Sequence, residues 1–253
     1  MIPLIVPDWP ATANLVAYTT TRQGGVSQGP YSSFNLSHAV GDDPPAVREN
    51  RQRLLQHIEL PGEWIELAQV HGTRCVVLDG QPLTDRRADG AYSRTPGCVC
   101  SVLTADCLPL LLCSKAGDEV AAVHAGWRGL AAGIIEATLE HFQSATTQLL
   151  VWLGPAIGPQ AFAVDEQVRA AFLANHPEAS VAFVDQAAGY WADLYQLARQ
   201  RLQAAGIPTQ QITGGHCCTF NEGERFFSYR RDGVTGRMAS VISFKSSTDY
   251  QET

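Results

Sequence analysis

A run of small and branched apolar residues leads into a glycine-rich turn at Glu119-Val120-Ala121-Ala122-Val123-His124-Ala125-Gly126-Trp127-Arg128-Gly129-Leu130. The apolar run over residues 120–123 is short and bounded on both sides, which predicts a buried strand. Apolar residues then recur at helical spacing from Leu130 to Phe142, which predicts a helix. The segment therefore combines a strand and a helix, as proteins built from packed sheets and helices do.

Both kinds of pattern recur along the 253 residues of the chain. Short apolar runs predict further buried strands at residues 64–70, 98–103, 108–113, 149–153, 226–229 and 240–244. Helices are predicted over residues 46–55, which follow acidic residues and prolines, and over residues 194–205, which precede Gly206. The mixture favours an α/β or α+β sandwich over a helical bundle or an all-β barrel.

The chain is acidic, with a net charge of −7 and a pI near 5.4. No run of Lys and Arg supplies the basic face that nucleic acids or membrane surfaces require, although one or two arginines suffice for a small anionic substrate. No stretch of about 18 apolar residues predicts a membrane span. Seven cysteines and no export signal predict reduced thiols and a cytoplasmic protein, with monomer or homodimer left open.

A histidine or cysteine stands near the end of three predicted strands, at His71, Cys107 and His124. Sheet proteins concentrate ligand-binding groups where strands emerge into loops. One thiolate and two imidazoles suit zinc, and three protein ligands leave a fourth tetrahedral position for water or substrate. Buried Cys and His are more often core residues, however, and the spacing matches no zinc finger, so the pattern alone does not decide.

Several polar residues are candidates for binding an anion. Arg128 stands in the first turn of the predicted helix, whose free N–H groups suit a phosphate, although the glycines there equally fit a tight turn. Arg22, Asn35 and Arg51 are weaker candidates, since most surface arginines are simply solvated. Asp106 precedes Cys107 and is a candidate proton carrier or orienting group, with a role in the turn as the alternative.

These segments closely resemble the YfiH-like family, long described as bacterial polyphenol oxidases or laccase-domain proteins. The resemblance rests first on Gln69-Val70-His71-Gly72, Thr104-Ala105-Asp106-Cys107-Leu108-Pro109 and Val123-His124-Ala125-Gly126-Trp127-Arg128-Gly129. It extends over nearly the whole chain, through Thr20-Thr21-Arg22, Gly24-Gly25-Val26-Ser27, Asn35-Leu36, Gly41-Asp42, Glu49-Asn50-Arg51, Gly154-Pro155-Ala156-Ile157-Gly158 and Phe227-Ser228-Tyr229-Arg230-Arg231-Asp232. This combination of motifs is specific.

The resemblance implies an α+β fold, a single-domain layered α/β/β/α sandwich with mixed sheets over residues 1–253. It implies an enzyme, a purine nucleoside phosphorylase that uses phosphate to cleave adenosine, inosine and S-methyl-5′-thioadenosine, and that also deaminates adenosine. It implies that His71, Cys107 and His124 bind Zn²⁺, and Cu²⁺ is the alternative ion. Two departures weaken any transfer nearby: Ala163 stands where relatives often carry Glu, and His216-Cys217 replace other polar residues.

Three other functions fit parts of the same sequence. A copper-dependent polyphenol oxidase needs many histidines, commonly as His-x-His pairs, and the seven histidines here include none: residues 38, 57, 71, 124, 141, 176 and 216. A cysteine hydrolase would use Cys107 as nucleophile and His71 or His124 as base. An editing factor for peptidoglycan precursors would bind a nucleotide-sugar in the same place.

Overall fold

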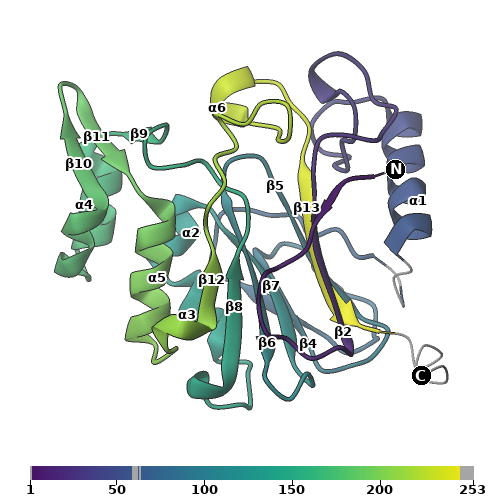
Figure 1. The fold of residues 1–253 in the computed structure, drawn as a ribbon, viewed down its shortest axis with the longest axis horizontal. Coiled ribbons are helices and arrows are strands. Elements are labelled where there is room, and N and C mark those ends of the chain that lie inside the picture. The colour runs from purple at the N-terminus through teal and green to yellow at the C-terminus, as the bar shows by residue number, and fades with distance from the viewer. Residues whose placement is uncertain (1, 59–61, 63, 246–253) are drawn as a thin grey trace.

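Two β-sheets pack face to face in the computed structural model, which describes residues 2–58, 62 and 64–245, and helices cover both outer faces (Figure 1). The larger sheet has the strand order β12-β8-β6-β7-β4-β3. Its strands are β3 Cys75–Leu78, β4 Gly90–Ser93, β6 Leu108–Ser114, β7 Val120–Ala125, β8 Leu149–Leu153 and β12 Ile212–Gly214. The β12–β8 and β3–β4 pairs are parallel and the other pairs antiparallel, so this sheet is mixed.

The smaller sheet is antiparallel and has the order β1-β2-β13-β5. Its strands are β1 Leu4–Ile5, β2 Leu15–Thr20, β5 Val99–Thr104 and β13 Met238–Phe244. Alternate residues of each strand face opposite sides. Thus Leu110 and Leu112 of β6 pack toward the helices, whereas Leu111 and Cys113 pack between the two sheets. Burial on both faces explains the uninterrupted apolar runs in the sequence.

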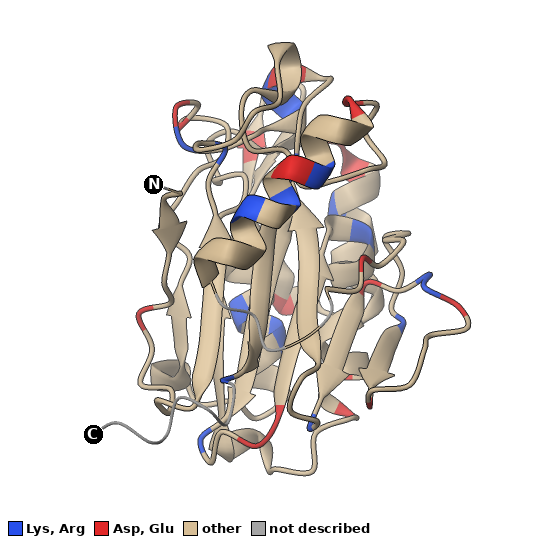
Figure 2. Ribbon diagram, turned by 90° about the vertical axis from the view of Figure 1, so that its right-hand side faces the viewer, with Lys and Arg blue, Asp and Glu red and all other residues tan. Residues whose placement is uncertain are grey.

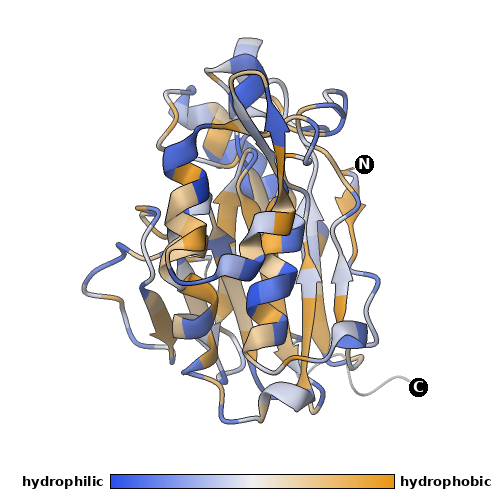
Figure 3. Ribbon diagram, turned by 90° about the vertical axis from the view of Figure 1, so that its left-hand side faces the viewer, coloured by the Kyte–Doolittle hydropathy of each residue, from blue (hydrophilic) through white to orange (hydrophobic). Residues whose placement is uncertain are grey.

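Helix α1, Pro44–Ile58, covers the outer face of the smaller sheet. Its Leu54 and Ile58 pack in one apolar cluster with Ala239 and Val241 of β13, and its charged residues lie on the surface (Figure 2). The other outer face is covered by α2 Trp127–Ala132, α3 Ile134–Leu139 and α5 Leu194–Ala204, whose apolar sides face the larger sheet (Figure 3). The predicted four-layer α/β/β/α sandwich is confirmed.

Smaller elements complete the chain. A three-stranded sheet of β9 Ala163–Val164, β10 Phe183–Gln186 and β11 Gly189–Ala192 lies beside α4 Glu166–Leu173 at one end of the molecule. The short helix α6 Tyr229–Asp232 lies near one end of the two large sheets. In the part of the chain that the structure describes, four 3₁₀ helices occupy Gly29–Tyr31, Thr146–Gln148, Pro177–Ala182 and Thr209–Gln211. Within the described residues, no helix is long and apolar enough to span a bilayer.

The strand predicted at residues 64–70 is wrong. This segment makes only two isolated bridges in the described structure, Trp64 with Val99 and Ala68 with Arg87. The Gln69 side chain takes the place of strand pairing: its Nε2 donates to Leu103 O at 2.8 Å, and its Oε1 accepts from Leu103 N at 2.7 Å. The apolar side chains line a cavity and a core without forming a strand.

Two further predictions need correction. The helix predicted from Leu130 to Phe142 begins earlier, at Trp127, and is divided into α2 and α3 by Gly133, whose φ of 105° lies in the left-handed region. The strand predicted at residues 226–229 is wrong, because Ser228 Oγ accepts a hydrogen bond from Arg231 N and caps α6. The predicted strands over 98–103, 108–113, 120–123, 149–153 and 240–244 and the helices over 46–55 and 194–205 are confirmed.

Asn50 of α1 forms hydrogen bonds to the loop over residues 26–35. The fully buried amide donates to Ser27 Oγ, Ser33 O and Asn35 O, and its Oδ1 accepts from Val26 N. Asn50→Ala should therefore lower the free energy of unfolding by about 3 kcal/mol, since it removes four hydrogen bonds and leaves buried groups unpaired. Urea titration measures the loss, with exposed Gln52→Ala on the same helix as control. A loss below about 0.5 kcal/mol would contradict the assignment.

Candidate metal centre and substrate cavity

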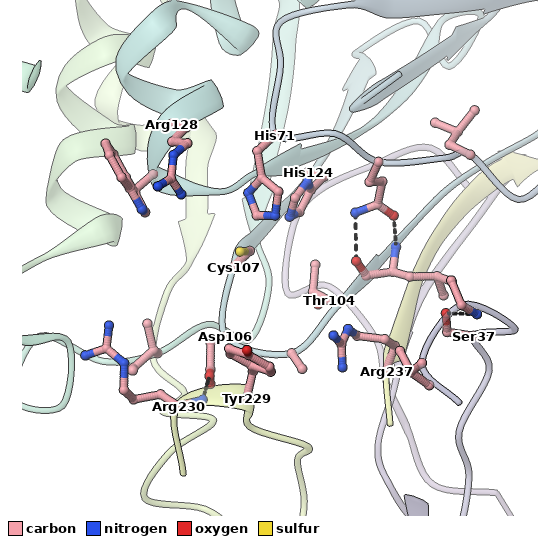
Figure 4. Close-up of a pocket in the computed structure, with 18 of the residues that line it drawn as sticks. Ser37, His71, Thr104, Asp106, Cys107, His124, Arg128, Tyr229, Arg230 and Arg237 are labelled. Carbon is pink, nitrogen blue, oxygen red and sulfur yellow. Dashed lines mark hydrogen bonds between the residues drawn. The ribbon is translucent and has the colours of Figure 1, made fainter. Parts of the chain in front are cut away.

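Three segments far apart in the sequence bring His71, Cys107 and His124 together. His71 lies in the loop before β3, Cys107 in the turn between β5 and β6, and His124 near the end of β7. One ligand atom from each residue lies within 4.8 Å of the other two, and the three side chains converge (Figure 4). The two imidazole rings meet edge to face, with centroids 4.8 Å apart. Among the described residues, this is the one cluster of three metal-ligating side chains.

The carboxylate of Asp89 holds two of these ligands in place. Asp89 is fully buried, and its Oδ1 accepts from His124 Nδ1 at 2.7 Å and from His71 N at 2.9 Å. Its Oδ2 accepts from Gly72 N at 2.7 Å and from Val70 N at 3.2 Å. The Asp89 carbonyl also accepts from His124 N at 2.7 Å. One side chain thus fixes the loop that carries His71 and leaves His124 Nε2 free to face the cluster.

The backbone is strained beside both loop ligands. His71 has a φ of 59° and Asp106 a φ of 92°, in the left-handed region that favours glycine. The Asp89 carboxylate compensates at His71 by accepting three successive N–H groups. Asp106 is held by its own side chain, which accepts from Thr219 Oγ1 and Arg230 N, both at 2.6 Å. Both oxygens of Asp106 are therefore engaged in shaping the Cys107 turn, which favours the turn role over proton transfer.

Two glycines of the motif at 124–129 explain the close packing of the site. A Cβ at Gly126 would lie 2.6 Å from His71 Nδ1 and 3.2 Å from Cys107 Sγ, so only glycine leaves room for these ligands. A Cβ at Gly129 would lie 2.7 Å from the Gly72 carbonyl oxygen. The start of α2 is therefore packed against the His71 loop. Close packing in this turn is therefore one reason for both glycines.

The charges of the cluster are coupled through Asp89. Burial opposes protonation of His124, but the neighbouring Cys107 sulfur and the hydrogen bond to Asp89 outweigh it and raise the pKa of His124 to about 9. Burial and the adjacent His124 lower the pKa of His71. Burial favours the protonated form of Asp89, yet its hydrogen bonds from His124 and Gly72 hold the pKa below its usual value. Without a metal, the raised pKa of His124 therefore favours its imidazolium form, which faces the Asp89 carboxylate.

The ligands open into a cavity of about 750 Å³. It lies at one end of the gap between the sheets, since His124 of β7 and Thr104 of β5 both stand on the faces that meet there. Its aromatic end is lined by Trp127, Ile157 and Phe162. Its polar end is lined by Ser37, Gln69, Thr104 and Arg237. A space of this volume accommodates a molecule the size of a nucleoside.

Arg128, one of the four residues predicted to bind an anion, lines this cavity. Its guanidinium is exposed and stacks over the ring of Trp127, with 4.3 Å between Cζ and the ring centroid. Arg230 stacks in the same way over Phe162 at 5.3 Å and donates to the Ala163 carbonyl. Two arginines therefore border the aromatic end of the cavity.

The other three predicted anion ligands lie outside the cavity. Arg22 donates to the carbonyls of Ser32 and Gly223 on the surface. Arg51 pairs with Glu66 at 2.5 Å and stacks over Trp64. Asn35 is fully buried and bonds to Ser37, Asp42 and the backbone N of Arg237. Their polar groups are used by protein partners, and Asn35 and Arg51 bond residues that line the cavity.

Sequence reasoning missed Asp89, Thr104 and Arg237 as functional residues. Asp89 carried one local signal: it is an acidic residue directly before a short run of small residues, which here is strand β4. Its partners are 17 to 35 residues away, so nothing in the local sequence identifies them. Arg237 comes from the far end of the chain and is placed by strand pairing.

Known proteins are similar to this chain in sequence and in fold. The family model described as "Multi-copper polyphenol oxidoreductase laccase" matches residues 16–245. "Purine nucleoside phosphorylase YfiH" of Shigella flexneri is 54% identical over 242 residues, which cover 96% of this chain and 99% of that protein. "Purine nucleoside phosphorylase" of Haemophilus influenzae is 50% identical over 246 residues, which cover 95% and 99%.

Solved structures of related proteins have the same fold. Neisseria meningitidis protein NMB0706 superposes with a TM-score of 0.89 at 45% identity, covering 96% of this chain and 99% of its own. YlmD from Geobacillus stearothermophilus superposes with a TM-score of 0.87 at 34% identity, covering 94% of each chain. The resemblance to YfiH-like proteins is thus confirmed over nearly the full length, in sequence and in structure. The chain belongs to the multi-copper polyphenol oxidoreductase laccase family.

Proposed function

We propose that this protein is a purine nucleoside phosphorylase with one zinc ion at His71, Cys107 and His124. One observation carries the proposal: three candidate ligands converge beside a cavity of nucleoside size, so a metal ion held by them would have room for a substrate as a further ligand. Relatives 50–54% identical over nearly the whole chain carry the name purine nucleoside phosphorylase. The substrates we propose are adenosine, inosine and S-methyl-5′-thioadenosine.

The donor set fits zinc. Thiolate and imidazole are both zinc ligands, and a zinc-binding histidine commonly donates its other ring N–H to a carboxylate, as His124 does to Asp89. When bound, zinc supplies Lewis-acid polarisation of an oxygen or nitrogen of the substrate. Gly126 leaves the space beside His71 and Cys107 that a larger residue would fill.

Phosphorolysis requires a phosphate oxygen to form a bond with C1′ of the ribose while the bond from C1′ to N9 of the purine breaks. The purine leaves with the bonding electron pair and takes up one proton. Trp127 and Phe162 offer aromatic faces to the purine, and the guanidinium groups of Arg128 and Arg230 border the same end. The protein contributes mainly by positioning the two reactants and stabilising the leaving base.

Adenosine deamination is a second candidate activity at the same centre. The observation that favours it is that three side chains, and no fourth, converge at the cavity among the described residues; zinc held by them would supply activation of water for addition to C6 of adenine. Ammonia would leave and inosine would form. The Pro-Cys-x-x-Cys signature of the zinc nucleobase deaminases is absent from the sequence, so this activity would use a different scaffold.

Copper and a free nucleophilic thiol are the rival uses of this centre. A Cys/His₂ set also binds copper, and the family is described as a multi-copper oxidoreductase. Multi-copper chemistry needs further ligand clusters, and the described residues contain this single one. A cysteine hydrolase would need Cys107 unbound and reactive, whereas a zinc-bound thiolate resists alkylation.

Removing the sulfur ligand tests the metal. Cys107→Ala should abolish zinc retention and reduce base release by at least about a thousandfold, while leaving the fold intact because this thiol is outside the apolar core. Elemental analysis of purified protein gives the zinc content, and Cys98→Ala is the matched control. Stoichiometric zinc in Cys107→Ala, or several coppers per wild-type chain, would contradict the assignment.

Incubation with adenosine tests the reaction itself. The zinc-loaded protein should release adenine only when phosphate is present, with ribose 1-phosphate as the second product, whereas inosine should form with or without phosphate. Chromatography resolves adenine, inosine and hypoxanthine. Failure to release base from adenosine, inosine and S-methyl-5′-thioadenosine in the presence of phosphate would sink the proposed function.

A further inference from the structure

The polar end of the cavity holds a buried hydroxyl without a partner. Thr104 is 2% exposed and lines the cavity, and its Oγ1 has no hydrogen-bond partner among the described residues. A buried polar group without a partner costs free energy, and nearly all such groups in folded proteins are satisfied. Because Thr104 belongs to the cavity wall, a bound ligand is the candidate partner for this hydroxyl.

Arg237 precedes Met238, the residue of β13 that pairs with Thr104 of β5, and it lines the same cavity as Thr104. Its Nη1 donates to the Thr235 and Gly236 carbonyls, and its Nε and Nη2 make no hydrogen bond within the described residues. Asn35 Oδ1 holds the Arg237 backbone N at 2.9 Å. A fixed guanidinium with unused donors, lining a cavity, is suited to an oxyanion.

Ser37 brings a third group to the same end of the cavity (Figure 4). It is 4% exposed, and its Oγ accepts from Ala39 N, so its own hydrogen is available to a ligand. The nearby carboxylates do not compete for Arg237, since Asp106 bonds Thr219 and Arg230 N and Glu66 pairs with Arg51. Two hydroxyls and one guanidinium therefore line the same end of the cavity.

We propose that Thr104, Arg237 and Ser37 form the subsite that binds inorganic phosphate for attack on the nucleoside. The inference rests on the proposed function and deepens it. Phosphate would then bind at the polar end of the cavity and not beside Arg128, which is exposed and stacks on Trp127. Phosphate at this end would reach C1′ of the ribose from the side opposite the purine, as displacement at C1′ requires.

The test is direct binding of inorganic phosphate to the zinc-loaded protein, measured by calorimetry or by ³¹P line broadening, without nucleoside. Thr104→Val keeps the shape and removes the hydroxyl, and Arg237→Lys keeps the charge and removes the guanidinium fork. Each should weaken phosphate binding about ten- to a hundredfold and raise the phosphate KM by a similar factor, with the nucleoside KM nearly unchanged. Thr213→Val is the matched control, because its hydroxyl is also buried and unpaired but lies outside the cavity.

Each outcome has one meaning. Phosphate affinity within about twofold of wild type in both Thr104→Val and Arg237→Lys would overturn the subsite, even if the wild type releases base. Phosphate binding that depends on these residues in a protein that releases no base would keep the subsite and reject the phosphorylase. A nucleoside 5′-monophosphate provides the second arm: if only its binding, and not that of free phosphate, depends on Thr104 and Arg237, the subsite is not for the cosubstrate.

Discussion

The carboxylate of Asp89 is the constraint on which the centre depends. It is fully buried at the start of β4, and it bonds three backbone N–H groups of the His71 loop and the ring of His124. These bonds hold His71 in a left-handed conformation that its side chain disfavours and set which nitrogen of His124 faces the cluster. Two ligands from different segments are thus positioned by one group, which itself lies beside β7 through strand pairing.

The layered fold decides where the cavity lies. Apolar side chains fill the gap between the two sheets, but at one end the inward positions of β5 and β7 carry Thr104 and His124. The Cys107 turn closes this end, and Asp106 ties it to α6 and to the loop at Thr219. Gly126 and Gly129 allow the His71 loop to approach α2 closely. The site residues therefore lie in the loops between strands and at strand ends, and the strands themselves are buried on both faces.

The sequence predicts the strands and helices better than it predicts the site. Strands such as Leu108–Ser114 are buried on both faces, so their apolar runs are unambiguous, and the three ligands follow from residue type near such runs. Residues 64–70 gave the same signal and form no strand, because Gln69 pairs through its side chain instead. Gly133 breaks a helix that apolar spacing predicts as continuous.

Long-range contacts account for the functional residues that the sequence did not predict correctly. Arg22, Asn35 and Arg51 sit in polar motifs typical of a binding loop, yet the fold turns their side chains onto protein partners. Asp89 and Arg237 acquire their roles from partners distant in sequence, through strand pairing and loop packing. Pattern and composition carry no information on such pairs.

Zinc affinity of Asp89→Asn, measured by chelator competition, tests the central claim most directly. Asparagine keeps the size of the side chain but replaces one acceptor oxygen with an NH₂ group. Either the acceptor shared by His71 and His124 or the one shared by Val70 and Gly72 is therefore lost. The account predicts a dissociation constant about 10- to 100-fold larger than that of wild type, with exposed Asp79→Asn unchanged. Zinc affinity within about twofold of wild type in a folded Asp89→Asn protein would contradict it.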